Sequence, residues 1–123
     1  MIRQILSVAS ACALGACAAR PIAGTMPAPI VDSTVEHARA RWPEVTAESL
    51  ARGRELFIAR CRRCHVLPDR RAYSDERWPK ILGTMGPRAK LDAVEQQQVL
   101  RFILADRDAN DSRAARAVVT PRG

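Results

Sequence analysis

The feature that most constrains this chain is a pair of cysteines, two residues apart, followed at once by a histidine: Cys61-Arg62-Arg63-Cys64-His65. Cys-x-x-Cys-His is the pattern by which a c-type haem is attached to protein. Each thiol adds to one vinyl group of the haem, the two intervening residues set the separation of the sulfurs, and the next imidazole falls under the iron. The motif therefore predicts one covalent haem c, bonded to Cys61 and Cys64, with His65 as proximal iron ligand.

Zinc sites and thiol-disulfide oxidoreductases also use a Cys-x-x-Cys pair. A zinc site needs a second pair of ligands, but the only cysteines and histidines outside the motif are Cys12, Cys17 and His37. A thiol oxidoreductase needs a thiolate of low pKa and, as a rule, a thioredoxin-like β-α-β pattern, which the sequence lacks. Haem attachment is the interpretation that needs no residues beyond the motif.

The first 16 residues have the features of an export signal. Arg3 precedes an apolar run over residues 5–14 that is too short to span a bilayer as a permanent helix. The run ends in Leu14-Gly15-Ala16-Cys17, which resembles the lipobox of bacterial lipoproteins, where the cysteine receives a diacylglycerol and becomes the mature N-terminus. We therefore expect residues 1–16 to be a lipoprotein-type signal peptide and Cys17 to be the lipidation site.

This signal predicts a periplasmic protein anchored to a membrane by lipid, and Ala18 after the cysteine favours the outer membrane. Two alternatives stay open, an ordinary secretory peptide and an uncleaved anchor. All three would export the chain to the compartment in which haem is attached.

Two segments of the chain show no sustained helical period. Residues 18–32 contain three prolines and one glycine, so we interpret residues 17–32 as a flexible tether. Residues 106–123 begin with a polar stretch and are expected to form a mobile polar tail. The segment between them, residues 33–105, is the predicted domain.

Helical patterns within residues 33–105 predict an all-α domain. A short helix is expected over residues 33–41, and a second over residues 47–60 with Thr46 as its N-cap. Gly53 and Phe57 share one face of the second helix. A glycine inside a helix costs about 1 kcal/mol relative to alanine. We therefore expect another helix to approach closely at Gly53.

The last helix is expected over residues 91–105, with Asp92 as its cap. Val99, Phe102 and Ile103 form its apolar stripe, which would pack against the second helix and the haem. The sequence shows no internal repeat and no second Cys-x-x-Cys-His motif, so one haem is expected.

Met85 is the candidate for the second axial ligand of the iron. It lies in Leu82-Gly83-Thr84-Met85-Gly86-Pro87, which we expect to be a loop after a short helix over residues 79–82. Twenty residues separate it from His65. At about 3.3 Å per residue, a chain of that length can pass around a haem to its opposite face.

Three other residues are candidates for contact with the haem. His37 is interpreted as an exposed or capping residue, with distal ligation as the alternative. Met26 is a poor ligand because the tether would first have to become ordered. Trp78 has two interpretations, packing in the core or contact with the haem edge and a propionate.

Together these elements resemble class I c-type cytochromes. The resemblance covers about residues 46–105 and rests on Gly53-x-x-x-Phe57, the Cys-x-x-Cys-His motif, a methionine loop and a terminal amphipathic helix. It implies a small cytochrome c fold with a haem-centred core, in which the N- and C-terminal helices cross near the glycine and the aromatic residue. It also implies that Met85 is the distal ligand and that the carbonyl of Pro68 supports the proximal imidazole.

Ligation by His65 and Met85 would fill both axial positions of the iron, which favours an electron carrier over an enzyme. The expected function is therefore transfer of single electrons between periplasmic or membrane redox partners. The alternative is a haem-based sensor or ligand-binding protein, in which Met85 dissociates to admit a gas or a peroxide.

The formal net charge of +7 raises the question of partners. Five arginines lie around the attachment motif, and a basic surface there could steer an acidic redox partner. The alternative is that they only keep the domain soluble. Nucleic-acid binding is not expected, given the compartment and the lack of a recognition motif. No feature of the sequence indicates an oligomeric state. The five are Arg60, Arg62, Arg63, Arg70 and Arg71.

Overall fold

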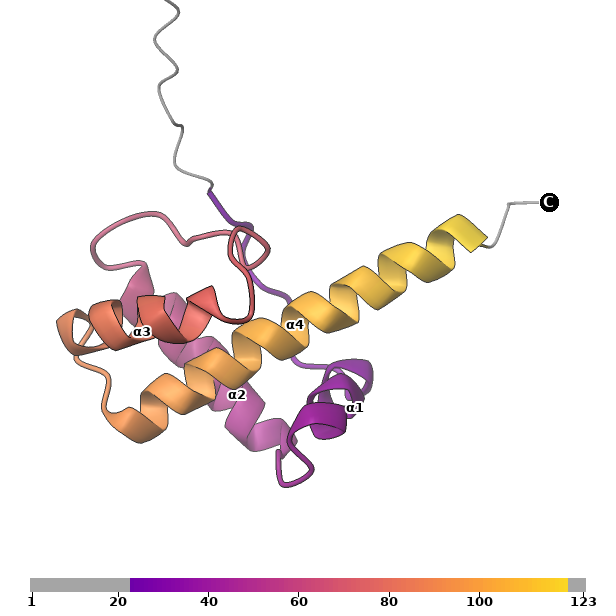
Figure 1. The fold of residues 1–123 in the computed structure, drawn as a ribbon, viewed down its shortest axis with the longest axis horizontal. Coiled ribbons are helices and arrows are strands. Elements are labelled where there is room, and N and C mark those ends of the chain that lie inside the picture. The colour runs from indigo at the N-terminus through magenta and orange to yellow at the C-terminus, as the bar shows by residue number, and fades with distance from the viewer. Residues whose placement is uncertain (1–22, 120–123) are drawn as a thin grey trace, which may run out of the picture.

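The computed structural model describes residues 23–119, and this part of the chain contains four α-helices and no strand. The helices are α1 (Asp32–Arg41), α2 (Ala47–Leu56), α3 (Arg77–Arg88) and α4 (Ala93–Val119), and a π-helical turn η1 (Phe57–Cys61) continues α2. Figure 1 shows α4 as the longest element, with the other helices packed around its first half and its last turns projecting beyond them. The predicted all-α fold class is confirmed.

Residues 1–22 and 120–123 are not described. The predicted signal peptide over residues 1–16 and the lipidation candidate Cys17 therefore lie outside the described residues. Within residues 23–119, no helix has both the length and the apolar character needed to cross a membrane.

Helix α2 begins at the predicted cap and packs closely on α4. The Thr46 side chain accepts a hydrogen bond from the backbone N–H of Ser49, and the Ser49 hydroxyl completes a reciprocal capping box. Farther along, a Cβ placed on Gly53 would lie 2.2 Å from the backbone oxygen of Gln98 in α4. The expected close approach is confirmed, and only glycine leaves room for it.

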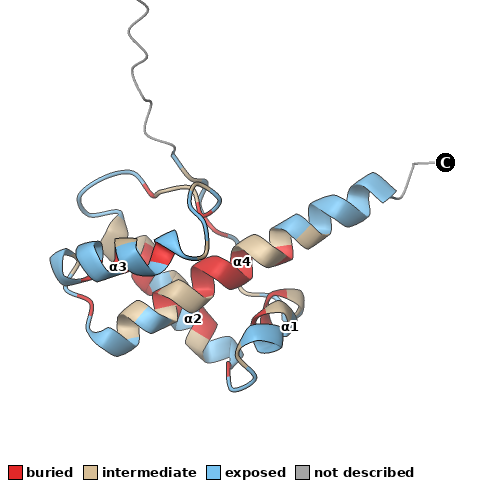
Figure 2. Cartoon of the chain, in the orientation of Figure 1, coloured by how far each residue is buried: buried red, intermediate tan, exposed pale blue. Residues whose placement is uncertain are grey.

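The core lies where α2, α3 and the first half of α4 meet, and Figure 2 shows the buried residues of α4 concentrated there. Val99, Phe102 and Ile103, the predicted apolar stripe, are fully buried. The ring of Phe102 lies 5.8 Å from that of Phe57, centroid to centroid. Asp92 caps the helix as predicted, through a hydrogen bond from the backbone N–H of Glu95 to its side chain (2.8 Å).

The prediction that α4 ends at residue 105 and gives way to a mobile polar tail is wrong for residues 106–119, which continue the helix to Val119. Several polar side chains in the first part of this stretch have partners elsewhere in the fold. Asp106 is buried in an ion pair with Arg70, and the hydroxyl of Ser112 bonds to Nε2 of His37 (2.8 Å). The composition of this stretch resembles that of a solvated tail, but these tertiary contacts stabilise it as a helix.

The prediction of a flexible tether is wrong for residues 23–31, which are extended but packed against the domain. The backbone N–H of Gly24 donates to the carbonyl of Leu67 (2.7 Å), and Pro27 is buried. The Arg54 guanidinium in α2 donates to the carbonyls of Pro27 and Ala28, each at 2.8 Å. Backbone carbonyls that a tether would leave to water are therefore bonded to the protein.

Candidate functional site

The Cys-x-x-Cys-His motif begins at the last residue of a π-helical turn. Helix α2 widens at Phe57 into η1, which ends on Cys61, and the chain then turns through Cys64 and His65. Such turns are rare and often occur at functional sites. Cys61 is half-buried, whereas Cys64 and His65 are exposed. Sequence reasoning predicted ordinary helix here, because nothing in the residue pattern distinguishes a π-turn from an α-helix.

The four predicted haem-binding residues, Cys61, Cys64, His65 and Met85, line a single cavity of about 420 Å³. This volume lies within the range of about 300–1,000 Å³ typical of pockets for small molecules and cofactors. Residues far apart in the sequence are thus brought together around one space. The rest of the lining is mostly apolar and includes Phe57, Trp78, Ile81, Leu82, Leu91 and Ile103.

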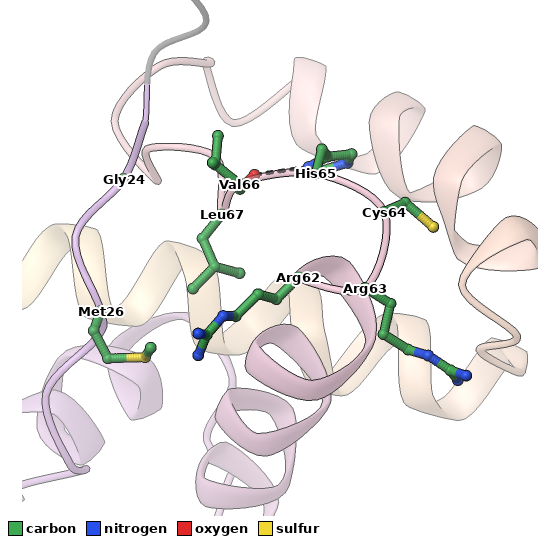
Figure 3. Close-up of a pocket in the computed structure, with 8 residues that line it drawn as sticks. All are labelled: Gly24, Met26, Arg62, Arg63, Cys64, His65, Val66 and Leu67. Atoms are coloured by element: carbon green, nitrogen blue, oxygen red, sulfur yellow. Dashed lines mark hydrogen bonds between the residues drawn. The ribbon is translucent and has the colours of Figure 1, made fainter.

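The ring of His65 is oriented by a hydrogen bond to the backbone. Its Nδ1 lies 2.7 Å from the backbone oxygen of Val66, the contact drawn as a dashed line in Figure 3. A carbonyl can only accept, so Nδ1 donates in this contact, and Nε2 is the ring nitrogen left for a metal. Metal-bound histidines nearly always donate their other ring N–H in this way.

The supporting carbonyl is not the one that the resemblance to class I cytochromes implies. That expectation named Pro68, but the structure assigns the hydrogen bond to Val66. The Pro68 carbonyl instead faces the N-terminal segment, where a Cβ on Gly24 would lie 2.4 Å from its oxygen. Pro68 still lines the cavity.

Met85 lies in a helix, so the prediction of a glycine and proline loop over residues 82–87 is wrong. Helix α3 spans the whole segment, and the N–H of Ala89 donates to the Met85 carbonyl (2.8 Å). No glycine in the described residues has positive φ, so Gly83 and Gly86 are not used as turn residues. The Met85 side chain still lines the cavity, and the residue is 41% exposed.

Both interpretations of Trp78 apply in part. The side chain is buried in the core and also lines the cavity. Its indole N–H donates to the backbone oxygen of Arg70 (3.1 Å), which uses its single donor. Trp78 can therefore contribute an apolar wall to the cavity, but no hydrogen bond to a propionate.

The five arginines of the predicted basic cluster have different environments. Arg70 is buried against Asp106, and Arg71 forms an ion pair with Asp111 (3.1 Å). Arg60 is half-buried and lines the cavity. Arg62 and Arg63 are exposed, and they line a second hollow of about 460 Å³. This hollow lies on the loop of residues 62–67 after η1, which we call the attachment loop. Sequence reasoning missed Arg88, a second arginine at the cavity, because its placement there depends on the continuation of α3.

His37 does not line the cavity, and both of its ring nitrogens form hydrogen bonds within the protein. Its Nδ1–H donates to the backbone oxygen of Ser33 (2.6 Å), and its Nε2 is hydrogen-bonded to the hydroxyl of Ser112 (2.8 Å). Met26 lines the hollow on the attachment loop together with His65, but not the cavity that contains both cysteines. Met85 is thus the methionine that shares a cavity with the complete motif.

Burial raises the pKa of the Cys61 thiol to about 11. A thiol with so high a pKa is almost entirely protonated at neutral pH, so it is a weak nucleophile for disulfide exchange. Within residues 23–119, no three His, Cys, Asp or Glu side chains come together in a group that could hold a bare metal ion. Neither the thiol oxidoreductase nor the zinc interpretation gains support from these residues.

Comparisons of this chain with protein-family models, with curated proteins and with solved structures find no match. The interpretation of the site therefore depends on the motif, the cavity and the hydrogen bonding of His65.

Proposed function

We propose that this protein is a monohaem c-type cytochrome that carries single electrons between periplasmic or membrane redox partners. The observation that supports this most strongly is the shared cavity, which is lined by Cys61, Cys64, His65 and Met85. Nε2 of His65, the ring nitrogen not used in the hydrogen bond to Val66, adds the donor that an iron requires. The residues present therefore fit a haem.

Each cysteine would hold the haem through a thioether, with sulfur bonded to a former vinyl carbon and the thiol hydrogen transferred to the neighbouring carbon. The bound haem supplies an iron that accepts and releases one electron reversibly. His65, through Nε2, and Met85, through its thioether sulfur, are the residues that would ligate the iron. A soft thioether favours the ferrous state and so raises the reduction potential.

The cavity walls would exclude water and balance charge. Phe57, Leu82 and Ile103 present apolar surface, which also favours the less charged ferrous state. Arg60 and Arg88 are the charged residues of the lining, and no carboxylate belongs to it. Two cations beside an apolar cavity suit a cofactor that carries two propionates.

The second candidate function is a haem-based sensor or ligand-binding protein. It is favoured by the 41% exposure of Met85, which lines the cavity, since an iron ligand with little packing around it is easier to displace. The two functions differ in whether the reduced protein binds carbon monoxide readily. An electron carrier with a stable methionine ligand should not.

The deciding experiment is an absorption spectrum of the purified mature protein, oxidised and reduced. We expect a c-type reduced spectrum and the weak near-infrared band of methionine bound to ferric iron. Met85→Ala should abolish the near-infrared band and keep the c-type spectrum. Met26→Ala is the matched control and should change neither, because Met26 does not line the cavity that contains both cysteines.

Loss of the band in Met26→Ala rather than Met85→Ala would show that the axial ligand is misassigned. A c-type spectrum without the band in the unmodified protein would favour the sensor. A protein without haem would refute the proposal altogether.

We further propose that Cys17 carries a lipid anchor, on the strength of the lipobox-like residues 14–17. Stable anchoring requires more than one acyl chain, and a diacylglycerol on this cysteine supplies two. Cys17→Ala should move the protein from the membrane to the soluble periplasmic fraction. Unchanged partitioning would refute the anchor and leave the haem proposal intact.

A further inference from the structure

The N-terminal segment is tied to the chain immediately after the attachment motif. The N–H of Gly24 donates to the carbonyl of Leu67 (2.7 Å), and Ala23 forms an isolated antiparallel bridge with Pro68. A Cβ on Gly24 would lie 2.4 Å from the Pro68 oxygen, so the two backbones are in close contact. The N-terminal part of the chain therefore leaves the described domain beside the attachment loop.

This exit point limits how far the domain can lie from a membrane. Six residues separate Ala23 from Cys17. Fully extended, they span about 20 Å at roughly 3.3–3.6 Å per residue. If Cys17 carries the proposed lipid anchor, the Gly24 side of the attachment loop must stay within that distance of the lipid surface, whatever conformation the six residues adopt.

The surface at this exit is basic and apolar. Met26 is 53% exposed and Val66 is 57% exposed, and both line the hollow on the attachment loop. Arg62 and Arg63 line the same hollow and are exposed, and no carboxylate belongs to its lining. Figure 3 shows these side chains around the loop, with the segment carrying Gly24 and Met26 running alongside.

We propose that this surface, formed by Met26, Arg62, Arg63 and Val66, lies against an anionic phospholipid bilayer; we call it the attachment-loop surface. Arginines attract anionic headgroups, and exposed apolar side chains can enter the interface beside them. The proposal depends on the lipid anchor at Cys17, which would hold the surface at the membrane.

The orientation has a consequence for electron transfer. Cys64 and His65 line the hollow of this surface as well as the proposed haem cavity. Their edge of the site would therefore face the bilayer, and the partner that exchanges electrons there would be embedded in or bound to the membrane.

Sedimentation with phospholipid vesicles tests the surface separately from the anchor. The test protein is full-length holoprotein with Cys17→Ala, mixed with vesicles of phosphatidylcholine alone or with added phosphatidylglycerol. We expect binding only to the anionic vesicles and weaker binding at high salt. Adding Arg62→Gln and Arg63→Gln should weaken it about 30-fold, since two arginines near an anionic surface are removed.

The matched control is Arg77→Gln with Lys80→Gln, which removes the same charge from exposed positions on α3 that do not line the hollow. It should weaken binding much less than the Arg62 and Arg63 pair. Equal weakening by both pairs would mean that only net charge matters, and would overturn the proposal. So would binding to neutral vesicles with the same affinity, or no binding to either.

A second measurement uses the lipidated protein on phosphatidylglycerol-containing vesicles. Met26 should be protected from hydroxyl-radical oxidation relative to the Cys17→Ala protein in solution, whereas Val118, exposed at the end of α4, should not. Unprotected Met26, or protection that requires an acidic partner protein rather than lipid, would overturn the assignment to a bilayer.

The absorption spectrum of the same samples keeps the two proposals apart. Loss of vesicle binding with an intact c-type spectrum refutes the attachment-loop surface alone. Anionic-vesicle binding by a protein without a haem spectrum supports the surface and refutes the cytochrome.

Discussion

Substitution of Gly53 by alanine tests the contact between α2 and α4. A Cβ at this position would lie 2.2 Å from the Gln98 oxygen, 2.7 Å from the Gln98 carbonyl carbon and 3.0 Å from Cβ of Phe102. The two nearest atoms are backbone, so they cannot rotate away as the end of a side chain could. Helix α4 would have to shift, and with it Phe102 and the core that borders the cavity.

The expected magnitude is the balance of two opposing effects. Alanine in place of a helical glycine stabilises by about 1 kcal/mol. Forcing an extra methyl into a packed contact costs roughly 1–3 kcal/mol, and a rigid backbone neighbour places Gly53 near the upper limit. We therefore expect Gly53→Ala to lower the free energy of unfolding by about 2 kcal/mol, or Tm by roughly 10 °C for a domain of this size.

Gly83→Ala provides the matched control. Gly83 also lies inside a helix, α3, but a Cβ there would meet nothing within 4 Å. It should raise the free energy of unfolding by about 0.5–1 kcal/mol. Urea unfolding of the two variants and the parent, followed by far-UV circular dichroism, measures both changes. If Gly53→Ala is as stable as the parent, or if both variants shift in the same direction, the close approach of α2 and α4 is refuted.

Two further predictions concern ion pairs. Asp106→Ala should cost about 3–5 kcal/mol, because it leaves the Arg70 guanidinium buried without its partner. Asp111→Ala removes an exposed pair from the same helix, with side chains 55% and 60% exposed, and should cost only about 0–1 kcal/mol; similar losses in urea unfolding for the two variants would contradict the burial of Asp106. The second prediction concerns pH. A hydrogen bond from Arg107 lowers the pKa of Asp75 below its unfolded value, so the unfolded state binds more protons in acid and stability falls as the pH drops below about 4. Asp75→Asn should flatten urea-measured stability over that range, and an unchanged acid slope would show that other carboxyl groups dominate.

Local residue patterns were sufficient for much of the helical framework. Thr46 and Asp92 cap their helices as predicted, since a capping side chain bonds to backbone only three residues away. The stripe of Val99, Phe102 and Ile103 is buried, because helical periodicity puts these residues on one face. The Cys-x-x-Cys-His motif is likewise recognised from only five adjacent residues.

Two of the predictions that failed depended on distant partners. The polar stretch after residue 105 has the composition of a tail. In the fold, however, its side chains contact Arg70 and His37, which lie far from it in the sequence. The N-terminal segment resembled a tether because its hydrogen bonds to Arg54 and Leu67 cannot be predicted from its own composition. In both cases, long-range contacts satisfy groups that local reasoning assigned to water.

By itself, the sequence determined the Cys-x-x-Cys-His motif, the all-α class, the principal caps and the need for a close contact at Gly53, since each depends on neighbouring residues or on one helical period. Only the tertiary structure decided that Met85 belongs to a helix, that Val66 rather than Pro68 orients His65, and that the N-terminal segment lies along the attachment loop. These features depend on which chemically equivalent donors, acceptors and apolar surfaces meet when the chain closes on itself, and a linear sequence of such groups is compatible with many pairings.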